Sequence, residues 1–425
     1  MRDNRASMIG EATASTAGFA ETAITVLMAG AGFVVALFAG YNLSLAAAAL
    51  LARDPPGAPR PRRRLVVLVP AHDEATQIER CVQSLQAQSY PSDLYQIVVV
   101  ADNCTDDTAA LAGAAGADVL VRDEPSARGK GRALRWGMER VLAGSSTPDA
   151  VVVVDADSQA DPELLAGLVG RFEAGVDAVQ GESLLLPNDS PQAALRATAF
   201  LLVNRVRPRG RAVLGAPSTL AGNGMLLSSA LLRDYPWDAY TSAEDLEYSV
   251  DLRLRGVKPG FAGGAIVYSD AAPSTRAATE QQLRWEGGKL HVARTRIPAL
   301  IATAVRSRRP SLFETVFELA VPPLGLLGAA AAAGAVASAL LVWVDVVAAW
   351  VLALWLLALL AIPVYVLLGL YAARAPRWAY RSLLRAPLFV LAKVVRARRA
   401  IGFSADVWVR TERAAEANPP DETAP

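Results

Sequence analysis

The sequence has few of the residues that form disulfide bonds and zinc centres. Its 425 residues include two cysteines, Cys81 and Cys104, and two histidines, His72 and His291. Zinc sites in proteins are built mainly from clusters of Cys and His, so we do not expect one here. Both cysteines fall in the part of the chain that we place in the cytosol, where thiols normally stay reduced.

An excess of charge of one sign is also missing. The 42 Lys and Arg residues balance 41 Asp and Glu residues, which leaves a formal net charge of +1. Proteins that bind nucleic acid usually carry a strongly basic surface, so we expect no nucleic-acid partner.

Apolar residues, by contrast, are abundant. Hydrophobic residues make up 53% of the chain and the mean hydropathy is +0.28, too apolar for an ordinary soluble enzyme. Uncharged runs cover residues 22–52, 319–344 and 346–373. Each exceeds the roughly 20 residues that a membrane-spanning helix needs, so we predict three spans, with Asp345 in a hairpin loop. The first run is much longer than the roughly 7–15 residues of a signal-peptide core, although Ala46–Ala49 resembles a cleavage site and leaves cleavage open.

Arginines flank these runs on one side. They follow the first run, precede the second and follow the third: Arg53, Arg60, Arg62, Arg63, Arg64; Arg306, Arg308, Arg309; Arg374, Arg377, Arg381, Arg385. The positive-inside rule places all three clusters in the cytoplasm, at the surface of the membrane lipids. We therefore expect a multi-pass protein of the cytoplasmic (inner) membrane, with residues 1–21 outside and the catalytic domain in the cytoplasm.

Residues 65–300 form one block between the spans, long enough for a core of its own. Apolar strands are predicted at 65–69, 96–100, 118–121 and 150–154, and helices at 77–88, 108–115 and 132–142. This alternation predicts an α/β domain with a mostly parallel, Rossmann-like sheet. Ligands then bind beyond the carboxyl ends of the strands.

The remaining segments are assigned by composition. Residues 53–64 are a basic linker and 301–318 a membrane-proximal segment. Residues 374–413 are basic, and 380–395, interrupted by Pro387, reads as an interfacial helix. Residues 414–425 are polar, and we expect a disordered tail.

The fourth predicted strand runs into Asp155-Ala156-Asp157. In an extended segment these two carboxylates project to the same side, where they repel unless a cation lies beside them. Mg²⁺ binds carboxylates together with phosphate oxygens, so the pair suggests a metal-bridged diphosphate. A solvated turn, with Asp161 capping a helix at Pro162, is the simpler interpretation. A phosphatase of the haloacid dehalogenase type, with Asp155 as nucleophile, is a further alternative, although Gln159 does not match its pattern.

Other candidate residues lie at the neighbouring strand ends and at two later segments. Asp102 can accept hydrogen bonds from a base or ribose, and Lys130, in a Gly-Lys-Gly turn, can reach a phosphate. Gly222-Asn223 is a tight turn that allows close approach to a ligand. Asp245 is a candidate general base, although Ser242 and Asp245 also fit a capping box. Gln281, Arg284 and Trp285 offer groups for a diphosphate and a sugar ring, although a membrane-interface belt has the same composition.

These motifs, in this order, resemble the family 2 glycosyltransferases, in particular the membrane-embedded synthase branch. That branch includes cellulose, hyaluronan and poly-N-acetylglucosamine synthases and ceramide glucosyltransferase. The segment 70–74 resembles P-x-x-N-E, and 101–108 resembles D-D-x-S-x-D-x-T with Ala101 for the first Asp. Residues 155–157 match D-x-D, and 242–245 resemble T-E-D with Ala243 for Thr. Residues 281–285 match Q-x-x-R-W, and 408–413 resemble W-x-R-T-x-R.

The resemblance implies a GT-A fold, an inverting transfer from a nucleotide sugar, and Mg²⁺ or Mn²⁺ as cofactor. Asp245, with Glu244, would be catalytic, and Asp157 and Asp155 would hold the metal. The nucleotide sugar would be bound by Pro70, His72, Glu74, Asp102, Lys130 and Asp155. The diphosphate and acceptor would be clamped by Gln281, Arg284, Trp285, Gly222 and Asn223.

The resemblance leaves the substrates open. A UDP-sugar is the favoured donor by resemblance alone, and a lipid or a growing polysaccharide is the acceptor. Transfer of a single sugar to a lipid is as compatible with the motifs as processive synthesis. A subunit that binds nucleotide without turnover is a further alternative.

Overall fold

A computed structural model describes residues 2–53, 62–144, 146–188, 190–272, 274–389 and 391. The predicted motif at 408–413 and the predicted tail at 414–425 lie outside these residues, as does 54–61 of the basic linker.

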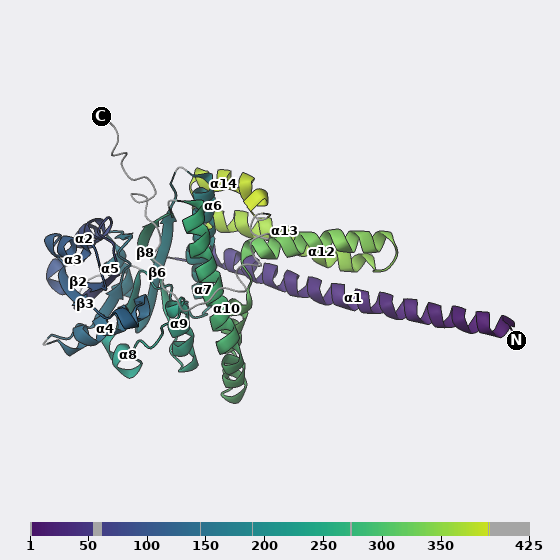
Figure 1. Cartoon of the computed structure of the whole chain (residues 1–425), viewed down its shortest axis with the longest axis horizontal. Helices are drawn as coiled ribbons and strands as arrows, with labels where there is room; N and C mark the ends of the chain where they lie inside the picture. The colour runs from purple at the N-terminus through teal and green to yellow at the C-terminus, as the bar shows by residue number, and fades with distance from the viewer. Residues whose placement is uncertain are drawn as a thin grey trace.

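An eight-stranded sheet forms the centre of the domain between the apolar helices, with strand order β3-β2-β1-β4-β7-β6-β8-β5 (Figure 1). The strands are β1 (Leu65–Ala71), β2 (Tyr95–Asp102), β3 (Asp118–Arg122), β4 (Ala150–Val153), β5 (Ser158–Ala160), β6 (Ala178–Leu186), β7 (Met225–Ser228) and β8 (Gly260–Asp270). The four strands predicted from the sequence are β1 to β4, and they pair in parallel. β7 runs antiparallel to β4 and β6, and β5 runs antiparallel to β8.

Helices cover both faces of the sheet. They are α2 (Ile78–Gln86), α3 (Thr108–Ala114), α4 (Lys130–Ala143), α5 (Leu164–Glu173), α8 (Ser229–Asp234) and α9 (Glu244–Leu254), with 3₁₀ turns η1 (Ser92–Leu94) and η2 (Pro125–Ala127). Alternate residues of β1 serve the two faces: Val67 and Val69 join one buried cluster, and Val66 and Leu68 join the other. This period of two explains why continuous apolar strands are needed here.

A second group of helices lies between the sheet and the apolar helices (Figure 1). It consists of α6 (Pro191–Leu201), the π-helical turn η3 (Leu202–Val206), α7 (Arg207–Val213), α10 (Thr275–Arg306) and α11 (Ser311–Ala320). Glu182 of β6 is fully buried and accepts hydrogen bonds from Arg205 and Arg209, which ties this layer to the sheet.

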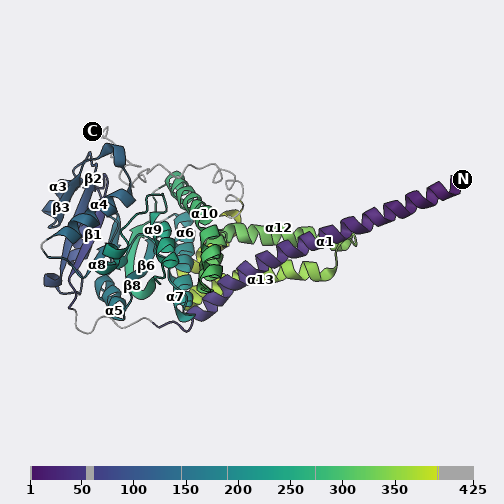
Figure 2. The same cartoon turned by 90° about the horizontal axis from the view of Figure 1, so that it is seen from below.

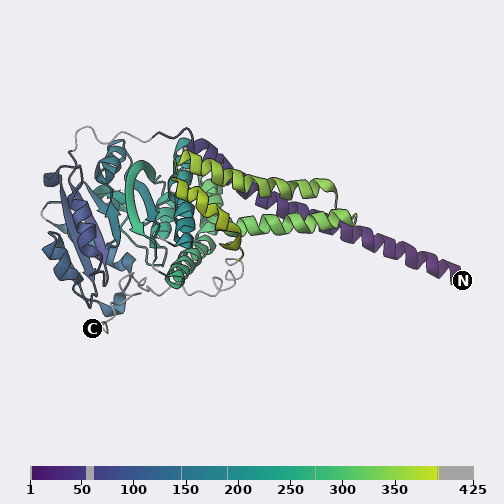
Figure 3. The same ribbon diagram turned by 90° about the horizontal axis from the view of Figure 1, so that it is seen from above.

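Three long helices lie side by side and point away from the sheet in Figures 2 and 3. They are α1 (Arg2–Ala49), α12 (Leu324–Trp343) and α13 (Ala349–Ala372), and α1 extends beyond the α12–α13 hairpin. Residues Gly18–Ala49, α12 and α13 are long and apolar enough to cross a membrane. Asp345 lies in the turn between α12 and α13, as predicted, with a φ of 59°.

Several predicted boundaries are wrong. The first span belongs to a helix that begins at Arg2, well before Thr22. The second apolar run is divided, because α11 ends at Ala320 and the prolines at 322 and 323 precede α12, and proline cannot continue a helical hydrogen-bond ladder. The predicted domain end at residue 300 falls inside α10. The interfacial segment begins earlier than predicted, as α14 (Arg377–Ser382) and η4 (Leu383–Arg385).

Candidate active site

The carboxyl ends of β1, β2 and β4 bring the first candidate residues to one edge of the sheet. Pro70 pairs with Val100, and the loop after β1 then carries His72 and Glu74 toward the end of β2. The Nδ1 of His72 lies 2.7 Å from the backbone oxygen of Asp102, to which it donates. The backbone N–H of Glu74 donates to the Thr108 hydroxyl at 2.7 Å, so α3 fixes this loop.

Asp102 has no exposed surface and is paired within the protein. Arg122, opposite it on β3, donates to Oδ1 at 2.5 Å, and the side-chain amide of Asn103 donates to the same oxygen at 2.9 Å. Burial raises the pKa of Asp102, while Arg122 opposes that shift. Within the described residues, Oδ2 is buried and has no hydrogen-bond partner. One acceptor atom of Asp102 therefore remains for a ligand.

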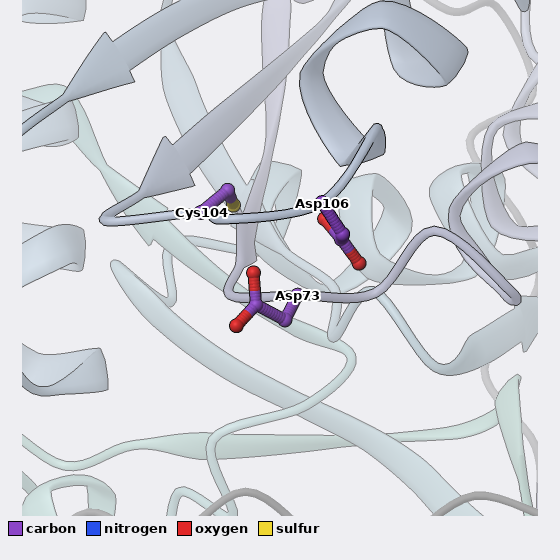
Figure 4. A group of neighbouring side chains, drawn as sticks. All are labelled: Asp73, Cys104 and Asp106. Carbon is purple, nitrogen blue, oxygen red and sulfur yellow. The ribbon is translucent and has the colours of Figure 1, made fainter. Parts of the chain in front are cut away.

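The same two loops also bring Asp73, Cys104 and Asp106 together (Figure 4). One potential ligand atom from each lies within 4.8 Å of the others. Asp73 accepts from the backbone N–H of Thr105 at 2.6 Å, and Asp106 accepts from that of Ala75 at 3.1 Å. These contacts show that the acids hold the two loops together, so the cluster has a structural role without a metal.

Lys130 is the centre of a second group of residues, here called the lysine-centred cluster: Lys130, Asp155, Gly222, Glu244 and Asp245. The Nζ of Lys130 lies 2.5 Å from Oδ1 of Asp155 and 3.8 Å from Oε1 of Glu244, and it donates to the backbone oxygen of Gly222 at 3.1 Å. A Cβ on Gly222 would lie 3.0 Å from Oδ2 of Asp245 and 3.2 Å from Nζ of Lys130. The structure therefore gathers five predicted residues from four distant segments.

Two glycines allow this convergence. Gly131 follows Lys130, and a Cβ there would lie 2.2 Å from the backbone oxygen of Ala239. The close approach brings the segment that leads into α9 against the start of α4. Gly222 has a φ of 70°, a conformation that favours glycine.

Asn223 forms hydrogen bonds that hold the segment of Asp155 in place. It is buried, its Oδ1 accepts from the backbone N–H of Asp155 at 3.1 Å, and its Nδ2 donates to Ser158 at 2.9 Å. Asn223 thus holds the backbone of Asp155 and the side chain of Ser158 in place, and its predicted role in clamping a ligand stays a prediction.

The segment from Asp155 to Asp157 is a turn, and the prediction of an extended segment is wrong. β4 ends at Val153, and the backbone oxygen of Asp155 accepts from the N–H of Ser158 at 3.0 Å. Burial raises the pKa of Asp155, Lys130 opposes this shift, and the charge of Asp157 adds to it. The contribution of Asp157 shows that the two carboxylates still lie close together. α5 begins at Leu164, later than predicted, and the Asp161 carboxylate accepts from the N–H of Glu163 at 3.1 Å just before the helix.

The acids at the start of α9 are hard to ionise. Burial raises the pKa of Glu244 to about 7, although Lys130 opposes the shift, and burial also raises the pKa of Asp245. The predicted capping box with Ser242 is wrong. Ala243 precedes α9 as its cap residue and makes no side-chain capping bond, while Thr241 accepts from the N–H of Ala243 at 3.4 Å and donates to Glu247 at 3.0 Å.

Gln281, Arg284 and Trp285 lie on α10, which crosses the start of α9. A Cβ on Gly288 would lie 2.8 Å from that of Ala243, so the two helices touch there. Arg284 is close enough to Glu244 to favour its charged form. Trp285 is 41% exposed and packs against Phe200 of α6, with ring centroids 5.5 Å apart. Gln281 lies one turn before Trp285 on the same helix face.

The sequence interpretation missed Arg122. The predicted third strand stopped at Val121, one residue short of it. The sequence does contain a signal for this pair. A cationic residue directly follows the predicted third strand, and that strand lies beside the one that ends in Asp102.

Comparison with known proteins identifies the family. Residues 61–288, more than half of the chain, match the model of the glycosyltransferase like family 2. The chain belongs to this family. The family membership agrees with the resemblance seen in the sequence, and the phosphatase alternative is not carried further.

Relatives in this family include membrane-lipid and polysaccharide synthases. The chain is 28% identical over 263 residues to the β-monoglucosyldiacylglycerol synthase of Synechocystis sp., a match that covers 58% of this chain and 54% of that protein. It is 23% identical to the poly-β-1,6-N-acetyl-D-glucosamine synthase of Staphylococcus aureus, over 53% of this chain and 54% of that one. The match thus spans about half the length of these curated relatives.

A solved structure with a similar fold is the mannosyltransferase PcManGT of Pyrobaculum calidifontis, in complex with GDP-Man and Mn²⁺. It is 20% identical, with a TM-score of 0.50, and the match covers 87% of this chain and 98% of that one. The similarity confirms the predicted GT-A fold with a mostly parallel sheet.

Proposed function

We propose that this chain is a membrane-bound, metal-dependent, inverting glycosyltransferase. It transfers a sugar from a nucleotide-diphosphate donor to a lipid or a growing polysaccharide at the cytoplasmic face of the inner membrane. The observation that carries the proposal is the lysine-centred cluster, in which three carboxylates meet one ammonium at the edge of the sheet. The three apolar helices support the membrane location.

The donor set fits a hard divalent cation. Asp155 and Asp157 offer carboxylate oxygens from one turn, and together with Glu244 and Asp245 they exceed the positive charge of Lys130. Asp157 and Asp155 would hold Mg²⁺ or Mn²⁺, and the solved complex of PcManGT contains Mn²⁺. When bound, the ion supplies positive charge that stabilises the diphosphate as it leaves.

The residues of the chain then have separate tasks. Asp245 accepts the proton of the acceptor hydroxyl, whose oxygen forms a bond to the anomeric carbon. The bond from that carbon to the diphosphate breaks, and the nucleoside diphosphate leaves with the electron pair. Lys130 and Arg284 would stabilise this negative charge. One base suffices for inversion, because the attack comes from the face opposite the leaving group.

A raised pKa suits this base. A carboxylate with the ordinary pKa of Asp is a weak proton acceptor at neutral pH, and burial of Asp245 makes it a stronger one. Glu244, whose pKa is about 7, neighbours Asp245, and the negative charge of either carboxylate makes the other harder to ionise.

The nucleoside would lie over the β1 and β2 ends, bound by the segment from Pro70 to Glu74 and by Asp102. The buried Oδ2 of Asp102 can accept a ring N–H, which uracil and guanine possess. We favour a UDP-sugar, and a GDP-sugar is the alternative that the same oxygen would accept.

The test is a donor panel with the full chain in lipid nanodiscs. UDP-glucose, UDP-N-acetylglucosamine and GDP-mannose are each supplied with Mn²⁺ and a membrane lipid extract, and products are identified by mass spectrometry. The proposal predicts metal-dependent release of nucleoside diphosphate together with a glycosylated product. Product length separates a single transfer from processive synthesis. Nucleotide binding without turnover of any donor would instead indicate a non-catalytic subunit.

A further inference from the structure

A basic junction joins the catalytic domain to the apolar helices. The segment Arg205-Val-Arg-Pro-Arg-Gly-Arg211 carries an arginine at every second position. Arg205 and Arg209 share Glu182, and Arg211 pairs with Glu314 and Glu318. Arg253 of α9 also pairs with Glu318, at 2.9 Å.

Arg207 is the arginine of this series that has no carboxylate partner among the residues that the structure describes. Its position at the membrane end of the domain is fixed by close packing on both sides. A Cβ on Gly369 of α13 would lie 3.4 Å from Val206, and one on Gly210 would lie 2.1 Å from the backbone oxygen of Leu45 in α1. Arg207 is half-buried at this border.

Lys289 lies near Arg207 and, like it, has no carboxylate in the described chain paired with it. Its Nζ donates to the backbone oxygen of Val321 at 2.8 Å, just before the start of α12. Burial, with a smaller contribution from the positive charge of Arg207, lowers the pKa of Lys289 to about 8. The nearby carboxylates are already engaged, since Glu318 pairs with two arginines and Glu286 accepts from Gln282.

The junction therefore holds more positive than negative side chains. The cations are Arg205, Arg207, Arg209, Arg211, Arg253 and Lys289, and the carboxylates are Glu182, Glu286, Glu314 and Glu318. Half-buried like charges that face each other raise the free energy of the folded protein unless an anion lies between them.

We propose that Arg207 and Lys289 form a binding site for the phosphate group of a membrane lipid. Arginine can grip two phosphate oxygens at once, and lysine adds a point charge. The site lies at the ends of α1, α12 and α13, the level at which lipid headgroups meet the protein if these helices span the bilayer. The inference does not depend on the proposed transferase activity.

The site is tested by the lipid that the full chain retains. The protein is taken from vesicles of equal parts phosphatidylcholine and phosphatidylglycerol, washed in detergent, and its bound lipids are counted by mass spectrometry. Wild type should retain the anionic lipid in preference. Arg207→Gln with Lys289→Met should lose that preference roughly tenfold, as expected when charge-assisted hydrogen bonds are removed.

A matched control removes the same charge nearby. Arg377 and Arg381 are exposed on α14, and Arg377→Gln with Arg381→Gln should keep the preference. Equal losses in both double variants would show a general surface attraction and overturn the proposal. Equal retention in wild type and the Arg207/Lys289 variant would overturn it too. In a second arm, inorganic phosphate is added at millimolar concentration to the protein with its bound lipid. Complete displacement of the lipid would point to a soluble phosphate as the ligand and contradict a lipid site.

Folding is checked separately. A variant that fails to fold would lose thermal unfolding in detergent altogether. The single variant Lys289→Arg retains the positive charge, so it should keep the preference for anionic lipid that the Arg207/Lys289 double variant loses.

Discussion

Two groups of acids lie along the same edge of the sheet and are neutralised in different ways. Asp102 is buried against its own arginine, Arg122, so that pair is complete in the folded chain. In the lysine-centred cluster three carboxylates share Lys130, and Arg284 approaches from α10. The first group therefore pairs its charges within the chain, whereas the second keeps more carboxylates than ammonium groups. We propose that the nucleoside binds at the first group and the diphosphate with its metal at the second.

The largest effect is expected from Asp245→Asn. The amide keeps the shape of the side chain but cannot accept the proton, so kcat for sugar transfer should fall by roughly 10³. Nucleotide affinity, measured by calorimetry, should change little. Transfer that continues at the wild-type rate would remove Asp245 from the mechanism.

A large loss of stability is expected from Asp102→Asn. The change leaves the buried Arg122 without its carboxylate, which should lower the free energy of unfolding by about 3 kcal/mol. Thermal unfolding of the full chain in detergent measures this. Asp118→Asn on the same strand as Arg122, where the carboxylate is exposed, is the matched control and should unfold like wild type. A stable Asp102→Asn protein would show that the pair is less completely desolvated than its burial indicates.

A smaller effect is expected from pH on the metal-free protein. The folded pKa of Glu244 is about 7 and its ordinary value is 4.5, so between these values the folded state binds more protons than the unfolded state. Stability should therefore fall as the pH rises through this window, by about 3 kcal/mol, and level off above it. The raised pKa values of Asp155 and Asp245 act in the same direction.

Glu244→Gln should flatten this dependence, because it removes the carboxyl group whose pKa is raised to about 7. Glu139→Gln, at an exposed position on α4, should keep the wild-type curve. Stability that rises across the same window in wild type would contradict the proposed excess of negative charge.

The sequence predicted the half of the fold in which local pattern and tertiary environment agree. β1 to β4 are buried on both faces, so their apolar runs are continuous and easy to detect. The antiparallel pairing of β5 and β7 depends on contacts between strands distant in sequence, and no local pattern specified it.

The candidate site shows the same division. The sequence supplied Lys130, Asp155, Glu244 and Asp245, and the fold brings them together. Local geometry was less predictable: the Asp155–Asp157 segment turns because Ser158 bonds back to Asp155, and Ala243, with no side-chain capping bond, precedes α9 in place of the predicted capping box.

Arg122 and the basic junction were not predicted at all. A partner for a buried charge is chosen by packing in three dimensions. The pairs that join Arg211 and Arg253 to α11 link residues far apart in the chain, which spacing alone does not reveal.

The central claim is that the lysine-centred cluster needs a divalent cation to accept a nucleoside diphosphate. The most direct measurement is the thermal midpoint of the full chain with UDP or GDP, in the presence of either Mn²⁺ or a chelator. The account predicts a rise of roughly 5 °C with nucleotide and Mn²⁺ together, little change with nucleotide and chelator, and loss of the rise in Asp157→Asn. An equal rise with the chelator, or a full rise in Asp157→Asn, would contradict it.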